Sequence, residues 1–294
     1  FYPAKASISN SHTNNHILQP MNTPQPHHIN ASANGNPAPV VIGATGGSGT
    51  RAFHGVLQGL GLFMGVRLNG AGDAMDFEPF LDKWINPLIG MDNRLDYTLS
   101  KAGFWRRWCI RRDFDKAFRV FTADRPAHGP WGWKNPRSMY VLPVIADRVP
   151  DFRFLHVVRD GRDMALSDNQ NQRRKHFQAL FGPQSSDRDS PAASATLWSM
   201  ANLQAADWGE SVLQERYLRI RLEDICAEPE RHVAAIARWL GLPDTPGFAE
   251  KVTVAARTIR APSSLGRWRQ AEEKDRQMIE DAAREALGRF GYLD

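Results

Sequence analysis

One run of residues, VVIGATGGSGTR at positions 40–51, sets the expected fold of this chain. Its β-branched start predicts a short strand, four glycines follow, and an apolar stripe at helical spacing begins at Phe53. Glycines let a backbone wrap closely around a ligand, and the first N–H groups of a helix lack partners within the helix. The run therefore predicts a site for phosphate or sulfate, in preference to an ordinary strand-to-helix turn.

Strands and helices are expected to alternate along the rest of the chain. Apolar runs at 152–158 and 217–222 predict further strands. Apolar residues at helical spacing predict helices over 77–88, much of 79–120, 139–146, 195–213, 229–240 and 272–287. This alternation predicts an α/β fold of the three-layer, P-loop-like type, with a mostly parallel central sheet flanked by helices.

Composition separates an N-terminal arm from a folded domain and argues against a metal site and a membrane-spanning segment. Residues 1–38 are rich in Asn, His and Pro, so we expect a disordered arm followed by one α/β domain at 39–294. No metal site is expected, since the two cysteines lack ligand spacing and His27 and His28 lie in a polar tract. The longest apolar stretch, 57–66, is too short to span a bilayer, and we expect a cytoplasmic protein.

The formal net charge of +5 suits an anionic ligand but falls short of a nucleic-acid footprint. The densest basic segment lies at 105–112, where Trp105-Arg106-Arg107-Trp108 is followed by Arg111 and Arg112. This pattern is as typical of a solvated helix face as of a binding surface. We therefore expect no nucleic-acid partner.

Charged residues gather where the second strand is expected to end. Arg159 follows the strand at 152–158, and Ser167 lies two turns into the next helix, so the two side chains can clamp one anion. Ligands gather at the carboxyl ends of the strands in an open parallel sheet, where the glycine run also lies. An alternative is that Arg159 only pairs with the charged residues at 160–163.

Three carboxylates lie one helix after the glycine run. Asp73, Asp76 and Glu78 occupy a glycine-bearing turn that is expected to form a wall of the same cleft. Any of these acids can cap the helix predicted over 77–88, Asp76 especially, and any can serve as a general base. The residues themselves leave both roles open.

Taken together, these segments resemble the sulfotransferases that use 3'-phosphoadenosine 5'-phosphosulfate (PAPS), especially the bacterial members and the tyrosyl-protein branch. The similarity is carried, in order along the chain, by Gly47-Ser48-Gly49-Thr50, Lys134-Asn135-Pro136-Arg137, Arg159-Asp160-Gly161-Arg162-Asp163 with Ser167, Arg219-Ile220-Arg221-Leu222-Glu223-Asp224, and Gly266-Arg267-Trp268. The resemblance implies in-line transfer of a sulfuryl group from PAPS to a hydroxyl or amine, with 3'-phosphoadenosine 5'-phosphate (PAP) as product and no metal. The implied acceptor is a small molecule, a carbohydrate or a peptide, and the oligomeric state is left open.

The resemblance also assigns roles to individual residues. The 5'-phosphosulfate is expected on Gly46, Gly47, Ser48, Gly49, Thr50 and Arg51. Arg159 and Ser167 match the residues that hold the 3'-phosphate, and Lys134 matches the lysine beside the transferred group. A looser match makes Gly266, Arg267 and Trp268 the loop that closes over the cofactor.

One departure from the family pattern concerns Gly47. Many members carry Lys or Arg at this position, so the missing positive charge is expected from Lys134 or Arg51. The acceptor must lose a proton as it attacks, and the tyrosyl-protein branch places an acid shortly after the loop's helix. The candidates for the base are, in order, Asp73, Asp76 and, more weakly, His128 and His156.

An NAD(P)-binding short-chain dehydrogenase is the main alternative. Gly43-x-x-Gly46-x-x-Gly49 after a strand is also a dinucleotide fingerprint, and Tyr97-x-x-x-Lys101 imitates that family's catalytic pair. Too few residues separate the two motifs for the βα units of such a fold. A P-loop kinase is disfavoured because the Gly-Lys-Ser/Thr ending is missing, and a non-catalytic nucleotide-binding role is a third alternative.

Overall fold

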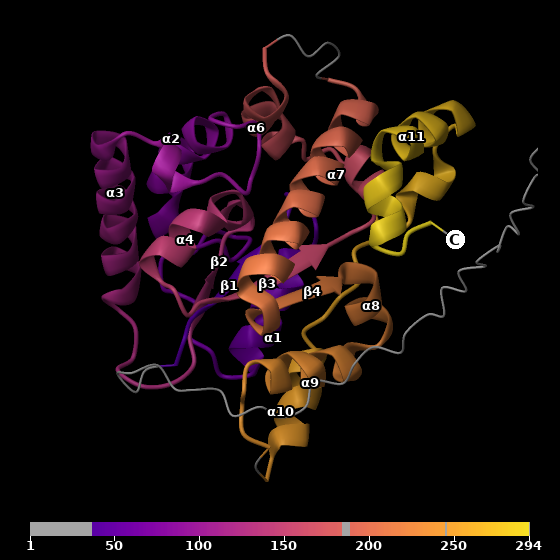
Figure 1. Cartoon of the computed structure of the whole chain (residues 1–294). Coiled ribbons are helices and arrows are strands. Elements are labelled where there is room, and N and C mark those ends of the chain that lie inside the picture. Colours follow the sequence, from indigo (N-terminus) through magenta and orange to yellow (C-terminus); the bar gives the residue numbers. More distant parts are fainter. Residues whose placement is uncertain (1–36, 184–188, 245, 294) are drawn as a thin grey trace, which may run out of the picture. The chain divides into compact units, whose positions relative to one another are not determined.

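The centre of the molecule is a sheet of parallel strands. The computed structural model describes residues 37–183, 189–244 and 246–293, so all but the last two residues of the arm expected at 1–38 lie outside it. The strands within these ranges are β1 (Val40–Gly43), β2 (Gly132–Lys134), β3 (Arg153–Val158) and β4 (Tyr217–Arg221). Their spatial order is β2-β1-β3-β4, and every neighbouring pair is parallel, which confirms the predicted sheet (Figure 1).

Side chains of β1 alternate between the two faces of the sheet and so join two different cores. Val40 and Ile42 pack on the face covered by α1 (Thr50–Gly59), α9 (Pro229–Trp239) and α10 (Phe248–Ala256). Val41 packs on the other face, which is covered by α2 (Glu78–Ile89), α3 (Phe104–Thr122), α4 (Leu142–Arg148), α6 (Asn171–Phe181) and α7 (Pro191–Trp208). The predicted three-layer arrangement of helices around a sheet is confirmed (Figure 1).

The remaining helices cover the ends of β3 and β4. They are α5 (Gly161–Ala165), α8 (Leu222–Ala227) and α11 (Glu273–Arg289). Helix α11 packs on α5 and α7 through a third core that includes Val158 at the end of β3. This packing fixes the segment that follows β3, which carries the charged residues at 159–163.

The order of the strands places the glycine loop opposite Arg159. The chain goes from β1 to β2 on one side of β1 and then returns to β3 on its other side. The connections that leave β1 and β3 therefore diverge and open a crevice at the carboxyl ends of these strands. The glycine loop follows β1, and Arg159 follows β3.

Some elements depart from the sequence-based expectation. The helical region expected over 79–120 is two helices, α2 and α3, separated by a segment that contains Gly90 and Gly103. Strand β2 was not predicted, because three residues are too few to display a period of two. Helices α6 and α10 were also missed, because α6 begins with a polar and basic run at 171–176 and α10 is only nine residues long.

Candidate active site

The glycine loop between β1 and α1 is shaped to receive an anion. Gly47 and Gly49 have φ angles of +92° and +78°, in the left-handed region that favours glycine. The hydroxyl of Ser48 turns inward and donates to the Thr45 carbonyl at 2.7 Å. Within the described ranges no side chain caps α1, and no acid lies in its first turn, from Thr50 onward. Its first N–H groups can therefore donate to a ligand.

Arg159 reaches from the end of β3 to this loop. Its Nη1 donates to the Gly47 carbonyl at 3.4 Å, and its Nη2 donates to Asp163 Oδ2 at 2.9 Å. Its Nε is buried and has no partner among the described residues, so the guanidinium retains a donor for a ligand. Ser167 lies on the same side, since a side-chain carbon on Gly47 would lie 3.8 Å from Ser167 Oγ. The structure thus brings Arg159 and Ser167 together at the glycine loop.

The alternative in which these charges pair with one another is also visible. Arg159 pairs with Asp163, and Arg162 donates to Asp160 Oδ2 through Nη2 at 2.9 Å. Asp160 in addition caps α5 by accepting from the Arg162 backbone N–H. Self-pairing and ligand binding do not exclude each other, because Arg159 has donors beyond the one that meets Asp163.

The segment 264–268 closes onto the same end of β3. Asp163 accepts from the backbone N–H of Gly266 at 2.7 Å and of Trp268 at 3.1 Å. Arg267 donates to the Leu166 carbonyl at 3.0 Å. The Trp268 ring lies 3.5 Å from the Arg162 guanidinium, measured to the ring centroid. All three residues expected in the closing loop are therefore held next to Arg159 by α5.

Lys134 ends β2 beside the glycine loop, because its partner in the sheet register is Ile42, one residue before the end of β1. Its ammonium lies 2.6 Å from Asp73 Oδ1 and donates to the Ala71 carbonyl at 2.7 Å. The other oxygen, Asp73 Oδ2, accepts from Asn69 at 2.8 Å. Burial lowers the pKa of Lys134, and the Asp73 carboxylate opposes this effect. The structure brings together the two residues expected to be the catalytic lysine and base.

His54 completes this cluster and was not predicted. It lies on α1, one turn after Thr50, is buried, and packs against Gly72. Its Nε2 has no hydrogen-bond partner among the described residues. Burial lowers the pKa of His54 and nearby Lys134 lowers it further, while Asp73 raises it. The imidazole is therefore neutral near pH 7.

Arg51 and Gln172 lie on either side of the glycine loop. Arg51 is exposed at the start of α1, and its positive charge helps to lower the pKa of Lys134. The Gln172 side chain, from α6, packs over Gly46, where an added side-chain carbon would meet it at 3.2 Å. Gln172 was not predicted, since nothing in the sequence around α6 indicates contact with the loop.

Asp76 and Glu78 lie in the same turn as Asp73 but have other partners. Asp76 does not cap α2 as expected, because Phe77 occupies the N-cap position and no side chain there accepts a capping bond. It instead accepts from Arg67 Nε at 2.6 Å. Glu78 accepts from Asn135 at 2.7 Å and pairs with Arg137. Of the three acids, Asp73 is the one that contacts Lys134.

The two weaker candidates for the base, His128 and His156, differ in burial, and so do Tyr97 and Lys101, which imitate a dehydrogenase pair. His128 is exposed in the loop before β2, while His156 is buried in β3 between Tyr217 and Asn202. Tyr97 is buried, and Lys101 pairs with Asp92 at 2.7 Å. Tyr97 and Lys101 therefore do not form a joint site with each other.

In the described part of the chain no group of His, Cys, Asp or Glu is arranged to hold a metal ion.

The chain is similar to known proteins in sequence pattern and in fold. Residues 39–246 match the profile of the sulfotransferase family. A search of curated proteins found no match. Solved structures with a similar fold include the sulfotransferase STF9 from Mycobacterium avium, with a TM-score of 0.53 and 12% identity over 86% of this chain and 76% of that one.

Two further solved structures also match the chain, at low sequence identity. The sulfotransferase STF1 from Mycobacterium tuberculosis H37Rv has a TM-score of 0.50 and 14% identity, over 84% of this chain and 76% of that one. A retinol dehydratase in complex with androsterone and inactive cofactor PAP has a TM-score of 0.47 and 15% identity, over 86% of this chain and 81% of that one. At these identities the structures of M. avium and M. tuberculosis show a common fold, while the residue roles rest on the site itself.

Proposed function

Because this chain belongs to the sulfotransferase family, we propose that the cluster at the ends of β1, β2 and β3 transfers a sulfuryl group from PAPS. The acceptor is a hydroxyl or amine on a small molecule, carbohydrate or peptide. The observation that carries the proposal is the meeting of two sites on one glycine loop. Arg159 contacts the loop from the end of β3, and Lys134 with Asp73 lies beside it at the end of β2.

The residues present fit a donor with two anionic groups. The left-handed glycines and the start of α1 direct backbone N–H groups at one position, where the 5'-phosphosulfate would bind. The 3'-phosphate would be held by Ser167 and by Arg159, through its buried Nε, which has no partner within the described ranges. The segment 264–268 lies against Arg159 and would cover it from solvent.

Lys134 supplies the positive charge that Gly47 lacks. It is buried, its ammonium lies beside the glycine loop, and no reorganisation of solvent is needed to place it there. The donor supplies a sulfuryl group whose bond to phosphate oxygen breaks as the acceptor atom bonds to sulfur. Lys134 and the loop N–H groups would stabilise the negative charge that grows on the departing phosphate. Arg51, which is exposed, is the less suitable of the two expected cations.

Asp73 is the proposed general base. It lies next to Lys134, and its side chain is 17% exposed, so an acceptor can approach it from solvent. Its carboxylate would take the proton that the acceptor hydroxyl or amine loses as it attacks. Asp76 and Glu78 are less suited to this step, because they pair with Arg67 and Arg137 and not with Lys134.

The test is transfer from ³⁵S-labelled PAPS to a phenol, an oligosaccharide and a tyrosine-containing peptide. Wild-type protein is expected to label at least one acceptor class and to release PAP. Lys134→Met is expected to lower the rate by about 10²-fold or more, whereas Arg106→Ala, at an exposed position on α3, should leave it unchanged. PAP binding without transfer to any class would favour the non-catalytic alternative, and an unchanged rate for Lys134→Met would overturn its role.

A further inference from the structure

Helix α3 presents large aromatic side chains to solvent, away from the active site. The helix buries one stripe, Ile110, Phe114, Ala117 and Phe121, against the core. At 100° per residue, Trp105 and Trp108 lie on the side of the helix opposite this stripe. Phe104, Trp105 and Trp108 are 67%, 74% and 48% exposed. The first turns of α3 therefore carry a second apolar side that the described residues do not cover.

These three residues, the α3 aromatic face, form a continuous surface. The ring centroids of Phe104 and Trp105 are 5.5 Å apart, and those of Trp105 and Trp108 are 6.4 Å apart. The Arg112 guanidinium lies 4.9 Å from the Trp108 ring centroid. Single exposed apolar residues need no explanation, but contiguous aromatic rings on a surface indicate an interaction site.

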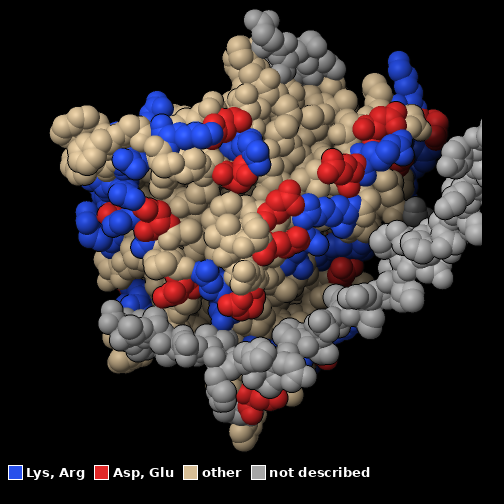
Figure 2. Space-filling view, viewed as in Figure 1, with Lys and Arg blue, Asp and Glu red and all other residues tan. Residues whose placement is uncertain are grey.

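The charges around the α3 aromatic face are positive. Residues 104–112 contain four arginines and no acid. Arg111 and Arg112 are paired with Asp147 and Asp113. Arg106 and Arg107 have no partner among the described residues and flank the α3 aromatic face, since at 100° per residue each lies 100° from the nearer tryptophan. These two guanidinium groups can bind an anion. Figure 2 shows Lys and Arg side chains gathered on the left edge of the molecule, where α3 lies.

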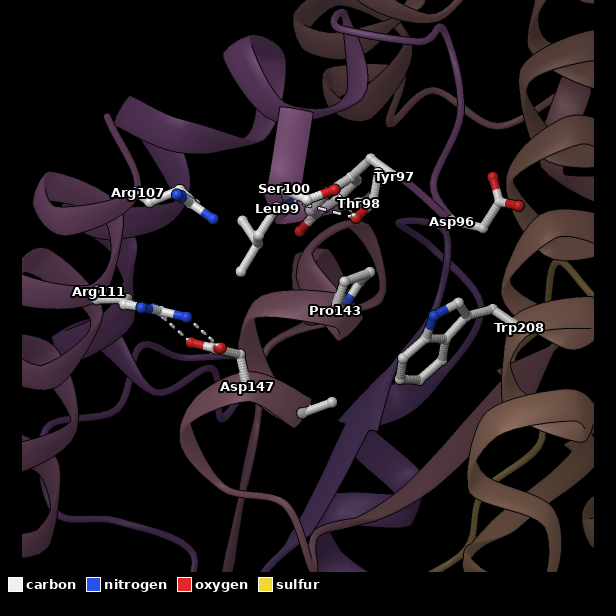
Figure 3. Close-up of a pocket in the computed structure, with 11 residues that line it drawn as sticks. Asp96, Tyr97, Thr98, Leu99, Ser100, Arg107, Arg111, Pro143, Asp147 and Trp208 are labelled. Atoms are coloured by element: carbon white, nitrogen blue, oxygen red, sulfur yellow. Dashed lines mark hydrogen bonds and ion pairs between the residues drawn. The ribbon is translucent and has the colours of Figure 1, made fainter. Parts of the chain in front are cut away.

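A shallow pocket of about 580 Å³ lies on another side of α3, between α3, α4 and the end of α7 (Figure 3). Arg107 and Arg111 line it from α3, while Leu99, Pro143 and Trp208 supply apolar walls. Figure 3 shows both arginine side chains on the α3 side of the pocket. The pocket shares no residue with the proposed active site. Asp96 and Asp147 also line it, and Asp147 pairs with Arg111, which leaves Arg107 as the lining arginine without a partner among the described residues.

We propose that the first half of α3 docks the protein reversibly on an anionic lipid bilayer. Trp and Phe rings suit the boundary between lipid headgroups and acyl chains, and clustered arginines bind lipid phosphates. A second copy of the chain suits the face less well, because a two-fold contact would bring its arginines against the same arginines. None of the described helices is long and apolar enough to cross a membrane, so this contact is one of surface docking.

The test is co-sedimentation of the full chain with phosphatidylcholine vesicles, with and without phosphatidylserine. Wild-type protein is expected to bind only the anionic vesicles and to be released by high salt. The double variant Trp105→Ser/Trp108→Ser, and separately Arg106→Gln/Arg107→Gln, are each expected to lower binding at least about tenfold. Val254→Ser, at a position 50% exposed on α10, is the matched control and should bind as wild type does.

Each variant is also titrated with PAP, because none of these residues belongs to the proposed active site and the affinity should stay unchanged. Equal sedimentation of wild type with both kinds of vesicle, or wild-type binding by the tryptophan variant, would overturn the proposal. Self-association of the wild type in sedimentation velocity would also overturn the proposal if the tryptophan variant abolished it. That result would show that the α3 aromatic face binds a second copy of the chain.

Discussion

Two ion pairs lie on opposite sides of the glycine loop. They differ in the burial of the carboxylate and in the hydrogen bonds that it accepts. Asp163 is fully buried and bonds Arg159 together with the backbone N–H groups of Gly266 and Trp268. Asp73 is 17% exposed and bonds Lys134 and Asn69. A fully buried acid that is held by three donors fixes its surroundings, whereas a partly exposed acid can exchange a proton with solvent. This difference supports the proposal that the first pair positions the anion site and that the second takes part in the chemistry.

The largest expected effect breaks the positioning pair. Asp163→Ala leaves the buried Arg159 guanidinium without its carboxylate and releases the segment 264–268. We expect it to lower the free energy of unfolding by about 3–5 kcal/mol, measured by urea denaturation, and to weaken PAP binding. Asp281→Ala, which removes an exposed pair with Arg284, is the control and should unfold near the wild-type midpoint. Wild-type stability for Asp163→Ala would refute the positioning role.

The second prediction concerns the chemical pair. Asp73→Asn keeps the shape of the side chain but removes the base, so kcat for sulfuryl transfer should fall by about 10²- to 10⁴-fold while PAP affinity stays within a few fold. Asp76→Asn is the matched control, since Asp76 is held by Arg67 and should change kcat little. If Asp76→Asn abolished transfer and Asp73→Asn did not, the assignment of the base would be wrong.

A third prediction uses pH to test His156, which is buried in β3 and belongs to neither ion pair. Burial lowers the pKa of His156 to about 3, while in the unfolded chain it is near 6.5. Between these values the unfolded state binds the extra proton, so stability is fully present above about pH 6.5 and is lost as the pH falls toward 3. His156→Gln should flatten the dependence of the unfolding free energy on pH by up to about 1.4 kcal/mol per unit. An unchanged slope would show that His156 is not held neutral.

The smallest expected effect lies in the loop between the two pairs. Gly47→Ala and Gly61→Ala replace glycines with the same φ angle of +92°, and each should cost about 1 kcal/mol of stability. Gly61 has no atom within 4 Å of the added carbon, whereas Gly47 meets Met164 at 3.1 Å beside the anion site. PAP affinity measured by calorimetry should therefore fall several fold for Gly47→Ala alone. Equal losses of PAP affinity in both variants would show that the glycine loop is not part of the binding site.

The fold could be predicted because its signals are local. The run at 40–51 shows a strand, a glycine loop and a helix start within one stretch. Strand β3 is a largely apolar segment, and β4 alternates apolar residues with arginines. The order of the motifs along the chain was enough to indicate the family. Strand β2 escaped prediction because its three residues gain their strand geometry from pairing with β1, which the local sequence does not record.

The contacts of the candidate site were harder to predict. Lys134 and Asp73 come from distant positions, and their pairing depends on where the turn after α1 lies against β2. His54 gives no signal, because a histidine on a helix is an ordinary core or surface residue until its neighbours are known. The sequence offered pairing of Arg159 with the charged residues at 160–163 as an alternative, but it gave no sign of the bonds that Asp163 accepts from Gly266 and Trp268.

The central claim is that Arg159 and the glycine loop form a site for a 3'-phosphorylated nucleotide. Calorimetric titration with PAP of wild type, Arg159→Ala and the control Arg106→Ala tests it most directly, with NADP as a second ligand. The account predicts that PAP binds wild type and Arg106→Ala alike and binds Arg159→Ala at least about tenfold more weakly, roughly 1.4 kcal/mol. Binding of NADP but not of PAP would contradict this claim, and so would an unchanged PAP affinity in Arg159→Ala.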